Sequence, residues 1–154
     1  MELFETLLYR VENQIATITL NRPEVRNSLN QKLRQELRQV VEKVSGDSGV
    51  RAVVLAAAGG GFCAGADLTE RLPGADKDGF VTEVLNREYN PLILAIRQSS
   101  KPFICAINGA AAGVGVSLAM ACDLVVMADD AYLYSAFGAI SLIPDGGFHK
   151  FLLE

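Results

Sequence analysis

The sequence lacks the features that mark several broad classes of protein. Lys and Arg number 14 against 18 Asp and Glu, a formal charge of -4, so no basic excess favours nucleic-acid binding. Three cysteines, Cys63, Cys105 and Cys122, are an odd number without metal-ligand spacing. We therefore expect reduced thiols, a cytoplasmic protein and no metal site. The first residues, MELFETLLYRVEN, lack the basic-then-apolar pattern of a secretory signal.

No charged residue lies between Lys101 and Asp123, a run long enough to raise the question of a membrane span. Asn108 and Gly109 interrupt this run, and a β-like segment precedes them. The pattern favours a buried strand followed by a buried helix. We therefore expect no membrane association.

Three common glycine motifs are incomplete. The stretch Gly113-Val114-Gly115 is not followed by the third glycine of GxGxxG, and no GxxxxGK[ST] occurs. Residues 115–119, GVSLA, fall one residue short of the GxSxG nucleophile elbow. A Ser117 hydrolase would need His149, the single histidine, as its base. A small residue on a buried helix is the simpler interpretation of Ser117, but the hydrolase stays open.

The chain of 154 residues, half of them hydrophobic, suits one domain, residues 1–154, with a proper core. Strand-like and helix-like segments alternate, which predicts an α/β layered domain. Residues 72–79 predict a surface loop, Pro91 should kink or divide a helix, and no internal repeat is apparent. The predicted strands are residues 7–11, 15–20, 51–57, 102–107, 123–128 and 132–134, and the predicted helices are residues 29–45, 80–96 and 114–121.

Two glycine-rich stretches, residues 59–68 and 109–118, each follow a predicted strand and are expected to lead into a helix. Such junctions present unpaired backbone N–H groups, and the second lies at a helix N-terminus, where the dipole adds positive potential. Two N–H groups aimed at one point form an oxyanion hole. The sequence therefore predicts an oxyanion-binding site between the two stretches.

The sequence resembles the crotonase superfamily, the enoyl-CoA hydratases and isomerases. Four motifs carry the resemblance and cover nearly the whole chain in order: NRPEVRNSL, FCAGADL, NGAAAGVGVSLAMACD and IPDGG. The resemblance implies the crotonase fold, a spiral of β-β-α units, and an acyl-CoA thioester as ligand, with no cofactor besides the coenzyme A of the substrate.

The resemblance also implies roles for individual residues. The N–H groups of Ala66 and Val114 match the two oxyanion donors of the family. Its CoA-binding positions match Ala64, Asp67 and Leu68, with Arg26 near the CoA phosphates or, equally, a solvated surface charge. A thioester α-proton is weakly acidic, and each such donor is worth about 3 kcal/mol of barrier when an enolate forms.

The acid–base positions depart from the hydratases of the family. These enzymes use two glutamates, and the matching residues here are Ser117 and Phe137. A third acid position of the superfamily, used by isomerases with one carboxylate, is occupied by Asp145. We therefore expect Asp145 to be the base of an isomerase that shifts a double bond. As a turn residue after proline, Asp145 could alternatively be structural.

Further alternatives remain open at this point: a hydratase that positions water differently, the Ser117 hydrolase, and a CoA-binding or assembly module without turnover. Chains of the family usually continue beyond the IPDGG turn into a helical region that builds trimer contacts. We therefore expect a truncated core that lacks this region, exposes apolar surface and forms a homotrimer or hexamer when full length. The acyl group that is bound is not predicted.

Overall fold

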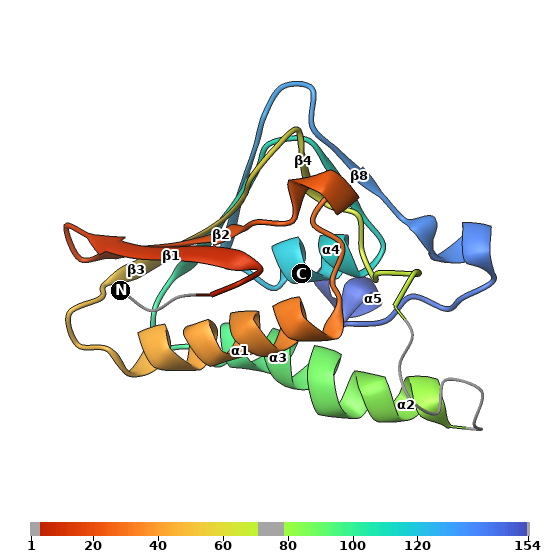
Figure 1. Ribbon diagram of the computed structural model, residues 1–154, viewed down its shortest axis with the longest axis horizontal. Coiled ribbons are helices and arrows are strands. Elements are labelled where there is room, and N and C mark those ends of the chain that lie inside the picture. The colour runs from red at the N-terminus through yellow and green to blue at the C-terminus, as the bar shows by residue number, and fades with distance from the viewer. Residues whose placement is uncertain (1–3, 71–78, 154) are drawn as a thin grey trace.

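The structure is a computed structural model that describes residues 4–70 and 79–153 (Figure 1). Residues 72–78 of the predicted surface loop lie outside this part of the chain. The described strands form a five-stranded sheet, in the order β1-β2-β3-β5-β7, and a three-stranded sheet, β4-β6-β8. The α/β architecture predicted from the sequence is confirmed.

The first two predicted strands, Leu7–Glu12 (β1) and Ile15–Leu20 (β2), pair antiparallel as a hairpin. Helix α1, Gln31–Gly46, follows, and Asn30 is its N-cap, because its side chain accepts a hydrogen bond from the Leu33 amide at 2.9 Å. The apolar face of α1 packs beneath the large sheet, next to α3 (Figure 1).

The central strands of the large sheet are β3, Ala52–Ala57, and β5, Phe103–Ile107. Both pair in parallel with their neighbours. The sequence predicts buried apolar strands here, and the structure shows that one face of each is more deeply buried than the other. Only alternate side chains, such as Val53 and Leu55, are fully buried, because helices cover one face and leave the other partly open.

The three-stranded sheet was not predicted, because two of its strands have only three residues each, made up of Gly, Ala, Phe and Cys, and carry no alternating pattern. It contains β4, Gly61–Cys63, β6, Ala110–Ala112, and β8, Tyr132–Tyr134, of which only β8 was expected. Strands β3, β5 and β7 of the large sheet each lead into one strand of the small sheet. This repetition of strand, strand and helix is the spiral that the resemblance implies. The successive units follow the same backbone path but have no sequence repeat.

One expected junction is wrong in its local structure. Residues 59–68 pass through β4 and a turn, and the next described helix, α2, begins only at Phe80. The helical stretch comprises α2, Phe80–Val84, a π-helical turn η2, Leu85–Tyr89, and α3, Asn90–Arg97. The wide turn stands directly before Pro91, which lacks an N–H and cannot fit a regular helix interior. The predicted irregularity at Pro91 is therefore confirmed.

Helix α4, Val114–Met120, lies between the small sheet and the α1–α3 layer (Figure 1). Strand β7, Leu124–Met127, is an edge strand with all four side chains exposed. A short helical turn, Ala136–Ile140 (η3), and α5, Phe148–Phe151, complete the described chain, and the 3-10 turn Pro23–Val25 (η1) lies near its start.

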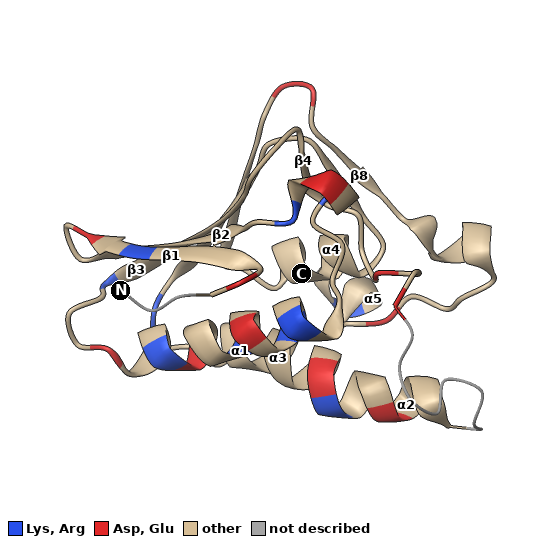
Figure 2. Cartoon of the chain, viewed as in Figure 1, with Lys and Arg blue, Asp and Glu red and all other residues tan. Residues whose placement is uncertain are grey.

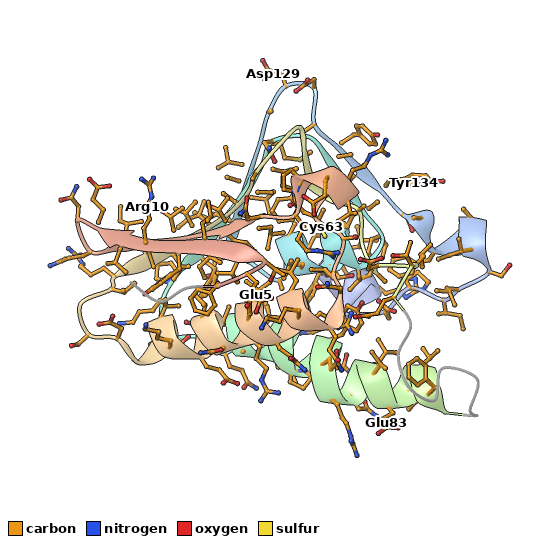
Figure 3. The ribbon with its side chains drawn as sticks, viewed as in Figure 1. Glu5, Arg10, Cys63, Glu83, Asp129 and Tyr134 are labelled. Carbon is orange, nitrogen blue, oxygen red and sulfur yellow. The ribbon has the colours of Figure 1, made fainter. Side chains whose placement is uncertain are left out.

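Charged residues gather on α1, on the helical stretch below it and at loop tips, whereas β7 and β8 carry none (Figure 2). Leu124, Val126 and Tyr132 are 59–62% exposed, and Tyr134 lies at the surface (Figure 3). The expected exposed apolar surface is therefore present, and a partner that covers it stays a prediction. In the described part of the chain no helix is both long and apolar enough to cross a membrane.

Candidate active site

A cavity of about 370 Å³ lies between the 64–70 segment, the start of α4 and the η3–α5 region. Its lining includes the three residues to which the sequence assigns chemistry, Ala66, Val114 and Asp145. Ala64, Asp67 and Leu68, the expected CoA-binding residues, also line it. The fold therefore brings together segments that lie far apart in the sequence.

The Ala66 amide is oriented by a bridge to the residue that precedes α1. Leu29 donates its N–H to the Gly65 carbonyl at 2.7 Å, and its own carbonyl accepts from the Asp67 amide at 3.3 Å. This parallel pairing uses the groups on either side of Ala66, so the Ala66 N–H points away from Leu29. Within the described residues the Ala66 N–H donates no hydrogen bond to the protein.

The Val114 amide is left free because Val114 is the first residue of α4. Its helical neighbour Val116 bonds back to the Gly113 carbonyl at 2.9 Å, but the Val114 N–H has no acceptor among the residues described. The Gly113 N–H donates to the Tyr134 carbonyl at 3.0 Å, which fixes the junction against the end of β8. Both amides therefore lack an acceptor within the described residues, and both residues line the same cavity.

The two amide segments are in direct contact. Gly65 has φ +93°, and a Cβ placed on it would lie 2.8 Å from the Ala112 carbonyl oxygen and 3.6 Å from the Val114 nitrogen. In the turn that follows Asp145, a Cβ on Gly146 would lie 3.2 Å from Val114 Cγ2. The segments that carry Ala66 and Asp145 therefore both pack against the start of α4.

Asp145 lies in the turn before α5, and its carboxyl group is partly buried. Its Oδ1 atom is buried and has no hydrogen-bond partner within the described residues. Burial raises the pKa of the Asp145 carboxyl above its ordinary value. Phe137 and Phe148 pack edge to face at 5.5 Å between ring centroids, and Phe137 lines the same cavity. The carboxyl group is therefore placed beside apolar groups, where it is a better base than an exposed aspartate.

Ser117 is fully buried on α4, and its hydroxyl donates to the Asp145 carbonyl at 3.0 Å. That contact ties the turn to α4 and commits the hydroxyl proton to a backbone carbonyl. His149 lies exposed on α5, with its ring against Phe148 at 6.2 Å. This arrangement favours a structural role for Ser117 over that of a nucleophile.

The residues expected to hold CoA divide between two cavities. Arg26 lines a second cavity of about 660 Å³, and Ala64 lines both cavities. Leu68 is 70% exposed. The Asp67 carboxylate is engaged by the Arg22 guanidinium at 2.9 Å and by the Thr69 hydroxyl at 2.7 Å, and these contacts hold its pKa below the ordinary value. The Asp67 side chain therefore helps to fix the conformation of the 64–70 segment.

A buried polar network on the cavity wall was missed from the sequence. Arg34, only 2% exposed, contacts Glu70, Glu88 and Tyr89, and both Arg34 and Tyr89 line the cavity. Burial raises the pKa of Tyr89 to about 12. A signal existed: Arg34 stands three residues before Leu37 and seven before Val41, on the apolar face of α1.

The three cysteines are free and buried, as expected for reduced thiols (Figure 3 labels Cys63). Burial raises the pKa of the Cys63 thiol to about 12, so it is a poor nucleophile. Among the described residues no cluster of three or more His, Cys, Asp or Glu side chains is arranged to hold a metal ion.

Comparison with known proteins identifies relatives of both reaction types. A protein of Escherichia coli (strain K12) named 1,2-epoxyphenylacetyl-CoA isomerase is 40% identical over 148 residues, covering 94% of this chain and 56% of that protein. A protein of Rhodobacter capsulatus named "Probable enoyl-CoA hydratase" is 42% identical over 144 residues, covering 94% and 54%. The chain thus spans about half the length of the curated relatives it matches.

The fold comparison agrees. The crystal structure of an enoyl-CoA hydratase from Polaromonas sp. JS666 has a TM-score of 0.86 at 33% identity, covering 95% of this chain and 57% of that one. The family profile described as enoyl-CoA hydratase/isomerase matches residues 10–154. The chain therefore belongs to the enoyl-CoA hydratase/isomerase family and has the crotonase fold.

Proposed function

We propose that the protein is an acyl-CoA isomerase that moves a double bond from the β,γ to the α,β position of an enoyl thioester. The observation that carries this proposal is one cavity lined both by Asp145, a partly buried carboxylate whose Oδ1 atom has no partner, and by two backbone amides that have no acceptor within the described residues. One carboxylate and two amide donors suffice for a proton shift through an enolate.

In the proposed reaction, Asp145 removes the α-proton of the thioester. The electron pair moves onto the carbonyl oxygen, and the β,γ double bond extends the conjugation to a dienolate. The amides of Ala66 and Val114 stabilise this oxyanion, each by about 3 kcal/mol. Asp145 then returns the proton to the γ-carbon, which leaves the conjugated enoyl thioester and the ionised base.

The acyl chain would occupy the apolar part of the cavity. This part is lined by side chains of α2, η2 and η3, which exclude water from the dienolate: Phe80, Val81, Val84, Leu85, Phe137 and Ile140. The CoA portion would pass Ala64 toward the second cavity, where Arg26 supplies a positive charge for a phosphate. No feature of the lining selects a chain length.

A hydratase is the second candidate, and relatives that carry that name favour it. The two family glutamates are replaced here by Ser117 and Phe137, both at most 4% exposed, and neither can activate water as a carboxylate does. The E. coli relative is named as an isomerase, which favours the first candidate. A cytoplasmic location and a trimeric assembly remain predictions.

The test uses the full-length protein and two substrates. A β,γ-enoyl-CoA should be converted to the conjugated isomer, followed by absorbance, while crotonyl-CoA should give little hydroxyacyl product. Asp145→Asn should abolish the conjugation, and the matched control is Asp129→Asn, an exposed aspartate at a loop tip (Figure 3). Binding of both thioesters without turnover would instead indicate a CoA-binding module.

A further inference from the structure

Arg34 is a buried cation that the proposed reaction does not use. It belongs to the first turns of α1, and its guanidinium contacts three separate segments of the chain. Burying an arginine is costly unless its N–H groups are paired, so the contacts of this side chain are expected to fix its surroundings.

The first contact is with the carbonyl that holds the oxyanion segment. Arg34 Nη1 donates to the Leu29 carbonyl at 2.6 Å, a short charge-assisted bond. The same carbonyl accepts the Asp67 N–H, which is the hydrogen bond on the C-terminal side of Ala66. Arg34 thus holds the atom against which the Ala66 peptide is aligned.

The second contact fixes the far end of the same segment. Arg34 Nη1 also donates to Glu70 Oε2 at 3.0 Å, and Glu70 Oε1 accepts the Gln31 amide at the start of α1. The loop from Gly65 to Glu70 is therefore held to α1 at both ends. These contacts therefore restrain the direction of the Ala66 N–H.

The third contact reaches the wall of the acyl cavity. Arg34 Nε donates to Glu88 Oε2 at 2.7 Å, and the guanidinium carbon lies 4.7 Å from the centre of the Tyr89 ring. Both partners lie on η2, and the preceding residues of α2 and η2 line the cavity. One side chain thus joins the oxyanion segment to the acyl-binding wall.

We propose that Arg34 is a positioning residue that holds the Ala66 amide in the direction of the thioester oxygen and links that direction to the acyl-binding wall. This inference rests on the proposed function, because it requires a thioester oxygen at the two amides. Arg34 would therefore affect the polarisation of the thioester carbonyl, and with it kcat. Ground-state binding of the acyl-CoA would stay nearly unchanged.

The test compares Arg34→Lys with Arg38→Lys in the full-length protein. Arg38 lies one turn further along α1, is exposed, and pairs with Glu42 at 2.7 Å, so it matches the chemistry without reaching the cavity. Lysine keeps the charge but cannot reproduce the fork of N–H groups. We expect Arg34→Lys to lower kcat about ten- to hundredfold with KM within about threefold, and Arg38→Lys to change neither.

A spectroscopic measurement separates positioning from folding and from the proposed reaction. The absorbance of a bound conjugated aryl-enoyl-CoA shifts to longer wavelength when its carbonyl is polarised, with no turnover needed. We expect this shift in the wild type, a smaller shift in Arg34→Lys and the full shift in Arg38→Lys. A shift without isomerase turnover in the wild type would overturn the proposed function and leave the positioning role standing.

Glu88→Gln is the second variant, for the case that Arg34→Lys does not fold. It keeps the Arg34 contacts with Leu29 and Glu70 and weakens only the link to η2, so kcat should fall severalfold and less than in Arg34→Lys. An unchanged absorbance shift together with unchanged kcat in the folded variants, or a change in KM alone, would overturn the inference.

Discussion

Two ionisable side chains that line the cavity have different surroundings. Arg34 is buried with two carboxylates, a carbonyl and a tyrosine around it, and its Nη2 atom meets Glu88 Oε2 at 2.6 Å as an ion pair without hydrogen-bond geometry. Asp145 is partly buried among apolar groups, with one carboxyl oxygen that has no partner in the described structure. The first arrangement stabilises the charged form, whereas the second destabilises it.

This difference indicates which group performs chemistry. A base must gain a proton readily, so an unpaired carboxylate with a raised pKa suits proton transfer. A guanidinium fixed by several partners cannot exchange protons at ordinary pH, but it can hold the backbone around it. We therefore infer that Asp145 transfers the proton in the proposed reaction and that Arg34 aligns the backbone.

The largest expected effect is that of Asp145→Asn on the rate. Loss of the base should lower kcat by about 10²- to 10⁴-fold. Because the folded-state pKa of Asp145 is raised, its ionisation opposes folding above the unfolded-state pKa, and the neutral amide removes this penalty at neutral pH. The variant should therefore be inactive but no less stable than the wild type in thermal unfolding at pH 7. A clear loss of stability would contradict the difference between the surroundings of Asp145 and Arg34.

Unlike Asp145→Asn, Arg34→Met should cause a large loss of stability. It leaves Glu70 and Glu88, whose side chains are 16% and 15% exposed, without their cation. Removing one partner of a buried ion pair typically costs about 3–5 kcal/mol. Urea unfolding measures this change, with Arg38→Met as the exposed control, and equal midpoints for the two variants would contradict the prediction.

The contrast also shows what could be predicted from the sequence. Ala66, Val114 and Asp145 are predicted as site residues because each stands in a recognisable local motif, and all three line one cavity, while their roles stay a prediction. Arg34 was missed because its partners Glu70 and Glu88 lie 36 and 54 residues away and belong to no motif. Long-range polar contacts of this kind depend on the packing of α1 against η2, which hydrophobic periodicity alone does not specify.

The same holds for the fold. The hairpin, α1 and the central strands follow from periodicity and from the Asn30 cap, both of which are local. Strands β4 and β6 have three residues each and consist of Gly, Ala, Phe and Cys, so they carry no alternating pattern. Their pairing is fixed by the turn of the spiral that brings β4 and β6 alongside β8.

Gly65→Ala should affect the segment between the two sides of the cavity. The positive φ and the 2.8 Å approach to the Ala112 carbonyl oxygen both oppose a Cβ, at a cost of roughly 1–3 kcal/mol. Gly79 has φ +80°, but a Cβ on it would meet no atom of the described residues within 4 Å, so Gly79→Ala is the control for conformation. The melting temperature and kcat should both fall further in Gly65→Ala than in Gly79→Ala. Equal effects of the two variants would rule out close packing of the amide segments.

The pH dependence of the reaction tests the surroundings of Asp145. The ionised carboxylate is the base, so kcat/KM should fall about tenfold per unit as the pH drops through its pKa. Burial raises that pKa, so the fall should begin above the ordinary value of about 3.9 for aspartate. A profile that stays flat down to that ordinary value would show a solvated, paired carboxylate and remove the contrast with Arg34.

Ser117→Ala should have the smallest effect. It removes the hydroxyl donated to the Asp145 carbonyl, but the Phe148 amide still donates to that oxygen at 3.0 Å. The loss should be about 1 kcal/mol, a fall in Tm of about 2–4 °C.

Ser45→Ala is the matched control, because Ser45 also donates to a backbone carbonyl, that of Val41, at 2.8 Å on α1. Both variants should lose similar stability, while only Ser117→Ala should change kcat, by a few-fold, because the turn that carries the base is less firmly held. Complete loss of an acyl-CoA hydrolase activity in Ser117→Ala would instead identify Ser117 as a nucleophile and move the chemistry from Asp145 to α4.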